Sequence, residues 1–344
     1  MNNVKGRINL EQIEEFKEML KEVRQIAIVP HSGPDGDAIG SSLALYQYFK
    51  KKGIAARIIS PNEYPVFLRW LPQNAEVAVY TEQADECLKW LENSNMILMV
   101  DHNSYRRSGD LEEILEKHPG KKVMIDHHPD PESILDLMFS EVAVSSTCEL
   151  VYEFIAALGD GELIDAGIAE CLYTGIMTDT GSLSYNSSDP RTYYIVADLL
   201  SQGIDKAKIH SNVYDNYSAD RMKLLGYCLN DKMEVLEEYR TAIITLTQEE
   251  LKKFNFKDGD TEGFVNYPLS IKGVVVSLIF IEKNGMVKIS FRSKGDVPVN
   301  MIAREHFNGG GHINAAGGRT DLSMQKAVAL FKEVLPEYKN IIVE

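Results

Sequence analysis

The sequence predicts an α/β protein in which an N-terminal, mainly parallel sheet carries helices on both faces and a smaller C-terminal α+β domain follows. Three observations support this fold class. Short apolar runs alternate with helix-length segments in the first half of the chain, residues able to bind metal follow several of these runs, and β-branched strands with a tight turn dominate the last third. Short apolar strands that alternate with helices are typical of a parallel sheet covered on both faces.

The first half of the chain supplies the strands expected in this sheet. They are the apolar runs at residues 25–30, 57–60, 95–101 and 123–126. Residues 38–52 have apolar side chains at helical spacing, and Gly53 follows them as a helix stop. Strand and helix are therefore expected to alternate along this part of the chain.

From about residue 145 the pattern becomes helical. Ser146 and Glu149 have the spacing of a capping box, which predicts a helix over residues 147–158. Further helices are expected over residues 166–177 and 190–203. The polar helical stretch that comes next is typical of a connector between two domains.

Beyond residue 235 the chain predicts a second, smaller unit. Its expected strands are residues 240–246, 273–281 and 286–291. Residues 283–285, Lys-Asn-Gly, predict a hairpin turn between the last two strands. Its expected helices are residues 247–254, 299–307 and 323–334.

Composition limits the classes of function. The net charge of −15 disfavours binding of long or duplex nucleic acid, because the surface repels polyanions. A short phosphorylated ligand remains compatible, since bound divalent ions reverse the local field. Apolar runs fall short of the roughly 18 residues of a membrane span, and the N-terminus does not resemble a signal peptide. Together with four cysteines that lack C-x-x-C spacing, this predicts a cytoplasmic protein with reduced thiols and no membrane association.

The most informative motif is Asp126-His127-His128, which follows a short apolar strand. Ligands of parallel sheets bind beyond the carboxyl ends of the strands. Other candidate metal ligands occupy similar positions, at or near the ends of apolar segments: His31, Asp35, Asp37, Asp101 and Asp179. Together they predict a mixed nitrogen and oxygen site for two divalent ions, as two-metal phosphoryl transfer requires. Such ligation suits Mn²⁺ best, with Mg²⁺ or Co²⁺ as alternatives.

Each of these residues also has a purely structural interpretation. Pro34-Asp35-Gly36 could form a turn in which Asp37 caps the following helix. Asp101 could be an ordinary strand-end residue, and Asp179 could close a helix. The joint occurrence of all the candidates favours the metal site over these separate explanations.

Two further features indicate phosphate binding near the C-terminus. Gly309, Gly310, Gly311 and His312 form a glycine-rich segment whose backbone N–H groups at a helix start could cradle phosphate, with His312 donating as well. The alternative is a close-packed turn in which only glycine fits. Arg292 ends a predicted strand and could bind phosphate with two parallel hydrogen bonds, or it could be a solvated strand-end residue.

These motifs together resemble the DHH/DHHA1 phosphoesterase family. The resemblance covers nearly the whole chain and both predicted domains. It is carried by His31-x-x-Pro-Asp35-Gly-Asp37, Asp101-His-Asn, Asp126-His-His, Asp179, Ile289-Ser-Phe-Arg292-Ser-Lys and Gly309-Gly-Gly-His312. The size and the segment Phe264-Val-Asn-Tyr-Pro268 look most like the bacterial oligoribonuclease (nanoRNase)/pAp phosphatase branch. The resemblance implies a DHH catalytic, metal-binding domain at residues 1–190, a helical connector at 191–232 and a DHHA1 substrate-binding domain at 233–344.

The resemblance also implies a function. The expected activity is two-metal-dependent degradation of very short oligoribonucleotides to mononucleotides, together with removal of the 3′-phosphate from pAp. The expected partners are therefore short oligoribonucleotides, pAp or dinucleotides, and a homodimer is left open.

Roles for the candidate residues follow from the same resemblance. The expected metal ligands are His31, Asp35, Asp37, Asp101, His127 and Asp179, with Asp101 shared by both ions. Of the two catalytic residues, His128 is expected to face the scissile phosphate and Asp126 to orient its neighbours. Arg292, with the segment from Gly309 to His312, is expected to bind the far phosphate or nucleotide.

Two rival functions remain. The nearer one is a phosphodiesterase acting on linear or cyclic di-adenylate, pApA or c-di-AMP. The more distant one is a protein that senses nucleotides without cleaving them, which the complete set of expected ligands disfavours. Metal-dependent turnover in a hydrolysis assay would separate an enzyme from a sensor.

Overall fold

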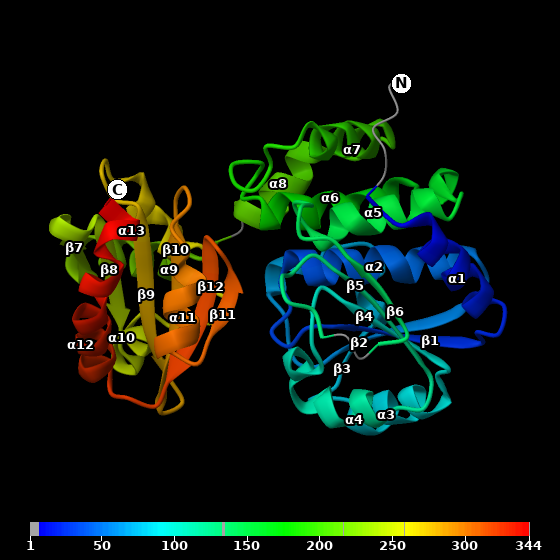
Figure 1. Ribbon diagram of the computed structural model, residues 1–344, viewed down its shortest axis with the longest axis horizontal. Coiled ribbons are helices and arrows are strands. Elements are labelled where there is room, and N and C mark those ends of the chain that lie inside the picture. The colour runs from blue at the N-terminus through cyan, green and yellow to red at the C-terminus, as the bar shows by residue number, and fades with distance from the viewer. Residues whose placement is uncertain (1–6, 133–134, 216, 258, 344) are drawn as a thin grey trace. The chain divides into compact units, whose positions relative to one another are not determined.

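The computed structural model describes residues 7–132, 135–215, 217–257 and 259–343, and the chain divides into two compact units, Met1–Asn216 and Tyr217–Glu344 (Figure 1). The division lies within the stretch predicted as a connector, residues 191–232. Helices α7 (Pro190–Ser201) and α8 (Lys206–Tyr214) belong to the first unit, and α9 (Ala219–Tyr227) belongs to the second.

The first unit is built on a six-stranded sheet in which every neighbouring pair is parallel. Its strands are β1 (Gln25–Pro30), β2 (Ala55–Ser60), β3 (Val77–Val79), β4 (Met96–Val100), β5 (Lys121–Asp126) and β6 (Leu137–Ser140). Their order is β3-β2-β1-β4-β5-β6, so the direction of strand addition reverses between β1 and β4. Ligands of open parallel sheets bind where this order reverses. The predicted parallel sheet is confirmed, and the two short edge strands β3 and β6 are additions to it.

Helices cover both faces of this sheet, as predicted (Figure 1). Successive residues of a strand point to opposite faces, so Ile26 and Ile28 enter one core and Ala27 and Val29 enter the other. The first core also contains residues of α1 (Leu10–Leu20), α2 (Gly36–Lys51), α5 (Thr147–Ala157) and α6 (Ala166–Asp179). The second contains residues of α3 (Ala84–Asn93) and α4 (Glu112–Lys117).

The helix caps differ from their predictions in two details. Asp35, rather than Asp37, caps α2, because its Oδ1 accepts from the N–H groups of Asp37 and Ala38. Ser146 caps α5, as expected, by accepting from the N–H of Glu149. The Glu149 carboxylate, however, accepts from Ser145 instead of the N-cap backbone, so the reciprocal half of the predicted capping box is wrong.

The second unit contains a mixed six-stranded sheet with the order β11-β12-β10-β9-β8-β7. Its strands are β7 (Met233–Leu236), β8 (Thr241–Leu246), β9 (Val276–Lys283), β10 (Met286–Ser293), β11 (Gly310–His312) and β12 (Ala315–Thr320). Only β8 and β9 pair in parallel among its described strands. Its other helices are α10 (Gln248–Lys253), α11 (Val299–His306), α12 (Met324–Val334) and α13 (Lys339–Val343). The α+β class predicted for this unit is confirmed.

Two hairpins of this sheet, β9–β10 and β11–β12, can be compared with their predictions. Asn284 and Gly285 join β9 to β10 with φ values of 53° and 80°, which matches the predicted tight turn. The segment Gly309–His312 was expected as a loop that leads into a helix start. Instead, Gly310–His312 forms strand β11, which pairs with β12 in a second hairpin. The helix-start part of that prediction is wrong.

Candidate active site

Three candidate residues lie side by side at the carboxyl edge of the first sheet. Val100 pairs with Pro30 on one side and with Ile125 on the other, so the residues that follow them, His31, Asp101 and Asp126, lie abreast at or just beyond the strand ends. This is the edge where the strand order reverses between β1 and β4. The fold therefore gathers these side chains where parallel sheets bind ligands.

Two helices bring further carboxylates to the same edge. Asp37 lies in the first turn of α2, and Asp179 is the last residue of α6. The helices pack closely because they meet at glycines. A Cβ at Gly40 would lie 2.6 Å from the Cys171 carbonyl oxygen, and one at Gly175 would lie 2.8 Å from Asp37 Oδ1. The absence of side chains at these two positions lets both aspartates reach the sheet edge.

The assembled ligands form two adjoining groups. In the first, His31 Nε2 lies 3.6 Å from Asp101 Oδ2 and 3.9 Å from Asp35 Oδ1. In the second, His127 Nε2 lies 3.8 Å from Asp37 Oδ2 and 3.8 Å from Asp179 Oδ2.

Asp101 lies between these groups. Its Oδ2 faces His31 at 3.6 Å, while its Oδ1 lies 3.7 Å from His127 Nε2. Its backbone has a φ of 62°, a left-handed conformation that aspartate tolerates better than most residues, and its N–H donates to the Ile125 carbonyl. Unusual backbone conformations of this kind occur often at functional sites. One carboxylate can thus contact both groups.

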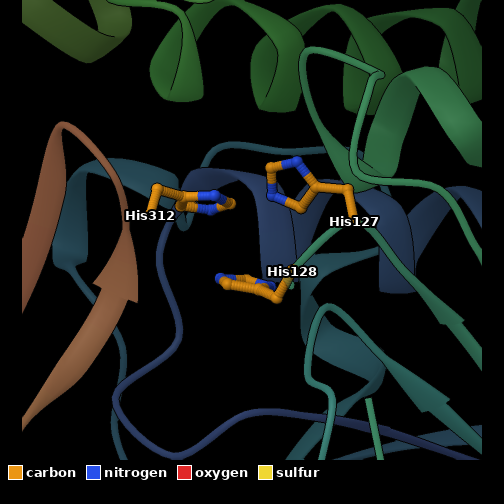
Figure 2. Close-up of side chains that lie close together, drawn as sticks. All are labelled: His127, His128 and His312. Carbon is orange, nitrogen blue, oxygen red and sulfur yellow. The ribbon is translucent and has the colours of Figure 1, made fainter. Parts of the chain in front are cut away.

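His128 is held differently from His127. Its Nδ1 lies 2.7 Å from Asp126 Oδ1, and its backbone N–H donates to Asp126 Oδ2 at 3.0 Å. Figure 2 shows the rings of His127 and His128, whose centroids are 4.8 Å apart with planes inclined by 70°. The buried Asp126 carboxylate therefore fixes the orientation of the His128 ring.

The electrostatics of the cluster reflect several charges held close together out of water. Burial, together with the nearby charges of Asp101 and Asp179, raises the pKa of Asp37 well above its usual range. Burial opposes ionisation of Asp101 too, but the close contact with His31 and the charges of the nearby histidines lower its pKa. Burial alone would lower the pKa of both His31 and His127, yet the surrounding aspartates raise both.

The spacing and the chemistry of these side chains are suited to divalent metal ions. The ligand atoms of His31, Asp35 and Asp101 all lie within 4.8 Å of one another, and so do those of Asp37, His127 and Asp179. Carboxylate oxygens with some imidazole nitrogen suit Mn²⁺, Mg²⁺ and related ions. Cations would also relieve the repulsion that raises the pKa of Asp37. The donor set fits divalent ions.

One residue of the cluster was missed in the sequence. The Thr147 hydroxyl donates to Asp101 Oδ1 at 2.7 Å, and its N–H donates to Asp37 Oδ2 at 2.6 Å. The N–H of Cys148 donates to the other Asp37 oxygen at 2.8 Å. The capping motif from Ser146 to Glu149 explains this segment without any contact to distant residues, so the role of Thr147 was missed. The sequence feature that indicates such a role is the run of small polar residues at the start of the helix that follows the last strand of the first sheet.

The second unit carries the predicted substrate-binding residues. Arg292 in β10 and His312 in β11 both pair with Ala315, from its two sides, so their side chains project from the same face of the sheet. With neighbouring strands about 4.8 Å apart, their backbones are separated by roughly 10 Å. Both side chains are half-buried. The sheet thus presents a guanidinium and an imidazole on one face, separated by a small residue.

Packing of the second hairpin explains two glycines of the glycine-rich segment. A Cβ at Gly309 would overlap the Gly317 carbonyl oxygen, and one at Gly311, where φ is 134°, would lie 2.6 Å from the Ala315 carbonyl oxygen. Gly310 differs, because a Cβ there would have no heavy atom within 4 Å. Close packing therefore accounts for Gly309 and Gly311 and leaves Gly310 without a steric explanation.

Each of the two units matches a known protein family model. Residues 25–176 match the model described as the DHH family, N-terminal domain, and residues 240–337 match the DHHA1 domain. The protein is a metal-dependent hydrolase that acts on phosphate esters. It belongs to the DHH family, as the sequence motifs predicted.

Similar proteins match along most of the chain. The probable bifunctional oligoribonuclease and PAP phosphatase NrnA of Streptococcus mutans is 30% identical, and the match covers 95% of this chain and 99% of that protein. The crystal structure of an exopolyphosphatase-related protein from Bacteroides fragilis matches with a TM-score of 0.94 and 42% identity, over 100% of both chains. The cyclic-di-AMP phosphodiesterase GdpP of Geobacillus thermodenitrificans is 26% identical over 94% of this chain and 49% of its own length.

Among the helices that the structure describes, none is both long enough and apolar enough to cross a membrane.

Proposed function

We propose that this protein uses two divalent metal ions to degrade very short oligoribonucleotides to mononucleotides, and that it also removes the 3′-phosphate of pAp. The observation that carries the proposal is the assembly of four aspartates and two histidines from four separate parts of the first unit at one sheet edge. The similarity to a probable oligoribonuclease and PAP phosphatase over 99% of that protein's length supports this substrate class.

His31, Asp35 and Asp101 would hold one ion, and Asp37, His127 and Asp179, with Asp101 shared, would hold the other. When bound, such ions supply Lewis acidity toward phosphoryl oxygens and make water more acidic. The proposed metal is Mn²⁺, because the donors are mostly carboxylate oxygens with two imidazoles.

Asp126 and His128 would act on the phosphate from outside this ligand set. The Asp126 carboxylate accepts from Nδ1 of His128 at 2.7 Å, which places a ring proton on that nitrogen and aims the opposite side of the ring away from Asp126. A protonated His128 would then donate to a phosphoryl oxygen and stabilise the charge that develops on it. In this proposal Asp126 positions the His128 ring and keeps a proton on its Nδ1.

Arg292 and His312 would bind the part of the substrate remote from the reacting bond. A guanidinium can donate two parallel hydrogen bonds to a phosphate or carboxylate. The spacing of roughly 10 Å between the two backbones would let each side chain reach toward one ligand from the same sheet face. The open position beside Gly310 would allow a ligand to approach the backbone there.

Charge and thiol chemistry agree with this proposal. A net charge of −15 disfavours long polyanions, whose many phosphates would be repelled, more than it disfavours a dinucleotide. The four cysteines are buried free thiols. Such thiols are common in the reducing cytoplasm, where we propose that the protein acts.

The test is a product time-course on 5′-labelled RNA of two to twenty-four nucleotides, with pAp, pApA and cyclic di-AMP assayed alongside. We expect Mn²⁺-dependent release of mononucleotides that is fastest from the shortest RNA, and loss of activity when a chelator is added. Equal rates on all RNA lengths, or turnover that survives chelation, would contradict the proposal.

A second candidate function is hydrolysis of linear or cyclic di-adenylate. The observation in its favour is the match to a cyclic-di-AMP phosphodiesterase over 94% of this chain. Because that match spans only 49% of the other protein, whereas the oligoribonuclease match spans 99%, the oligoribonuclease function is better supported. Cyclic di-AMP consumed faster than the RNA dinucleotide in the same assay would reverse this order.

A further inference from the structure

We infer that Thr147 is a positioning residue that sets the geometry of both metal groups through its contacts with Asp37 and Asp101. The inference rests on the proposed metal site, since it concerns how these two carboxylates are held. Thr147 is not one of the proposed metal ligands, so this role adds a residue to the proposed site.

Thr147 uses two different donors on two carboxylates that come from distant parts of the chain. Its Oγ1 donates to Asp101 Oδ1 at 2.7 Å, and its backbone N–H donates to Asp37 Oδ2 at 2.6 Å. Asp101 follows β4, whereas Asp37 lies in α2. Thr147 therefore fixes the positions of these two carboxylates relative to each other.

The position of Thr147 at the start of α5 favours a negative charge on Asp37. Thr147 and Cys148 are its first two residues, and their N–H groups donate to the two oxygens of Asp37 at 2.6 Å and 2.8 Å. The N-terminus of a helix carries partial positive charge and unpaired N–H groups. A buried Asp37 carboxylate is thereby stabilised from one side, which leaves its opposite side for a cation.

A buried hydrogen-bond network around Glu149 holds the start of α5 in place. The Ser145 hydroxyl and the Thr192 hydroxyl both donate to Glu149 Oε2, at 2.5 Å and 2.8 Å. Ser145, Thr147 and Glu149 are all buried. This network ties the turn before α5 to α7, so the Thr147 donors have little freedom to move.

The consequence concerns the shared carboxylate. Asp101 Oδ1, which accepts from Thr147, is also the oxygen 3.7 Å from His127, while Oδ2 faces His31. A donor that fixes Oδ1 therefore fixes the rotation of the whole carboxylate, and with it the direction in which each oxygen faces its group. Partners that orient metal ligands typically change metal affinity or activity by about 10- to 100-fold when they are removed.

The experiment is a calorimetric titration of the full-length, metal-free protein with Mn²⁺, in wild type, Thr147→Val and Thr147→Ser. Valine keeps the shape of threonine and removes the hydroxyl donor, whereas serine keeps the donor. We expect Thr147→Val to weaken Mn²⁺ binding by about 10- to 100-fold, and Thr147→Ser to restore binding close to wild type. Circular dichroism of the metal-free variants checks that they fold.

A matched control is Thr174→Val. Thr174 is another fully buried threonine, but its hydroxyl donates to the Glu170 carbonyl within α6 rather than to a carboxylate of the cluster. Its Mn²⁺ affinity should equal that of wild type. If Thr147→Val fails to fold, Thr147→Ala, which removes the hydroxyl without adding volume, takes its place in the comparison with serine.

The possible outcomes separate the two proposals. Unchanged Mn²⁺ affinity in the variant without the hydroxyl, or an equal loss in the serine variant, would overturn the role of Thr147 while leaving the metal site intact. A wild-type protein that binds no Mn²⁺ would overturn the proposed metal site, and the role of Thr147 with it.

Discussion

The two units of this protein hold their polar groups in opposite ways. In the first, Asp37, Asp101 and Asp126 are 1%, 2% and 0% exposed, and the charge of Asp101 repels those of the other two. In the second, Arg292 and His312 are half-buried on an open sheet face. Buried charges are costly unless they are paired or bound to metal, whereas a partly exposed polar side chain keeps part of its hydration. This difference fits the proposal that the first unit binds metal cations and that the second unit binds phosphate.

The largest effect is expected at Asp101, the carboxylate that faces both groups of ligands. Asp101→Asn removes charge from the oxygen pair that faces both metal groups, so we expect hydrolysis of a dinucleotide to slow by about a thousandfold, since metal ions contribute several kcal/mol to such reactions. Initial rates at saturating Mn²⁺ measure the effect. The matched control is Asp136→Asn, at the opposite end of the same sheet, where the carboxylate accepts from the Lys122 N–H. Similar losses in both variants would contradict the assignment.

The second prediction concerns a buried imidazole beside the cluster. Burial lowers the pKa of His102 to about 4. Its Nδ1 lies 3.0 Å from the Val100 carbonyl oxygen and its Nε2 lies 3.1 Å from the Ser108 hydroxyl, so the neutral ring is well held. Between pH 6.5 and 4 the unfolded chain binds a proton that the folded chain does not, so stability falls as pH falls, by about 3 kcal/mol across this window.

Urea unfolding at a series of pH values measures this effect. His102→Gln removes the titrating group, so the stability of that variant should depend less on pH between 6.5 and 4 than that of wild type. Parallel pH profiles in the two proteins would exclude His102 as the cause.

The third prediction tests the phosphate binding that we propose for the second unit. Arg292→Ala should raise KM for a dinucleotide by about 10- to 100-fold, because hydrogen bonds to charged groups contribute about 1.5–3 kcal/mol. The same variant should barely change the hydrolysis of a small chromogenic phosphodiester, which lacks a remote phosphate. Lys288→Ala is the control, since Lys288 lies on the same strand and face and is exposed. Equal effects on both substrates would argue against binding of the remote phosphate.

The fourth and smallest effects compare glycines in helices of the two units. Gly175→Ala would force a methyl group against Cys148 and Asp37, so we expect a loss of about 1–3 kcal/mol in the free energy of unfolding. Gly226 lies in α9, and a Cβ there would have no heavy atom within 4 Å. Gly226→Ala should therefore stabilise the protein by about 0.5–1 kcal/mol. Denaturant unfolding measures both, and stabilisation by Gly175→Ala would contradict the close packing of α2 and α6.

Much of the first unit could be predicted because its central strands are continuous apolar runs. The strands at residues 25–30 and 123–126 were expected from this pattern, and both are confirmed. β3 and β6 escaped prediction because edge strands of three and four residues are too short to establish a period. The candidate ligands were found for a similar reason: each lies close to an apolar segment that the sequence itself marks.

What could not be predicted depended on contacts between distant residues. Local capping explained the sequence around Thr147, while its hydroxyl contacts Asp101, 46 positions away. The glycine-rich segment reads as a loop by itself, and it becomes a strand only because β12 lies between it and β10. Propensity is a weak guide where tertiary pairing decides the conformation.

The order β3-β2-β1-β4-β5-β6 also has a consequence for folding. The reversal brings position 31 beside position 101, and the cluster then needs residues as distant as 179. Contacts so far apart in sequence form slowly, because long loops must close before the contacts can stabilise the chain. A metal ion that binds this cluster thus stabilises the completed unit over its partly folded forms. Metal binding would then add stability only after the parallel sheet has formed with the correct strand order.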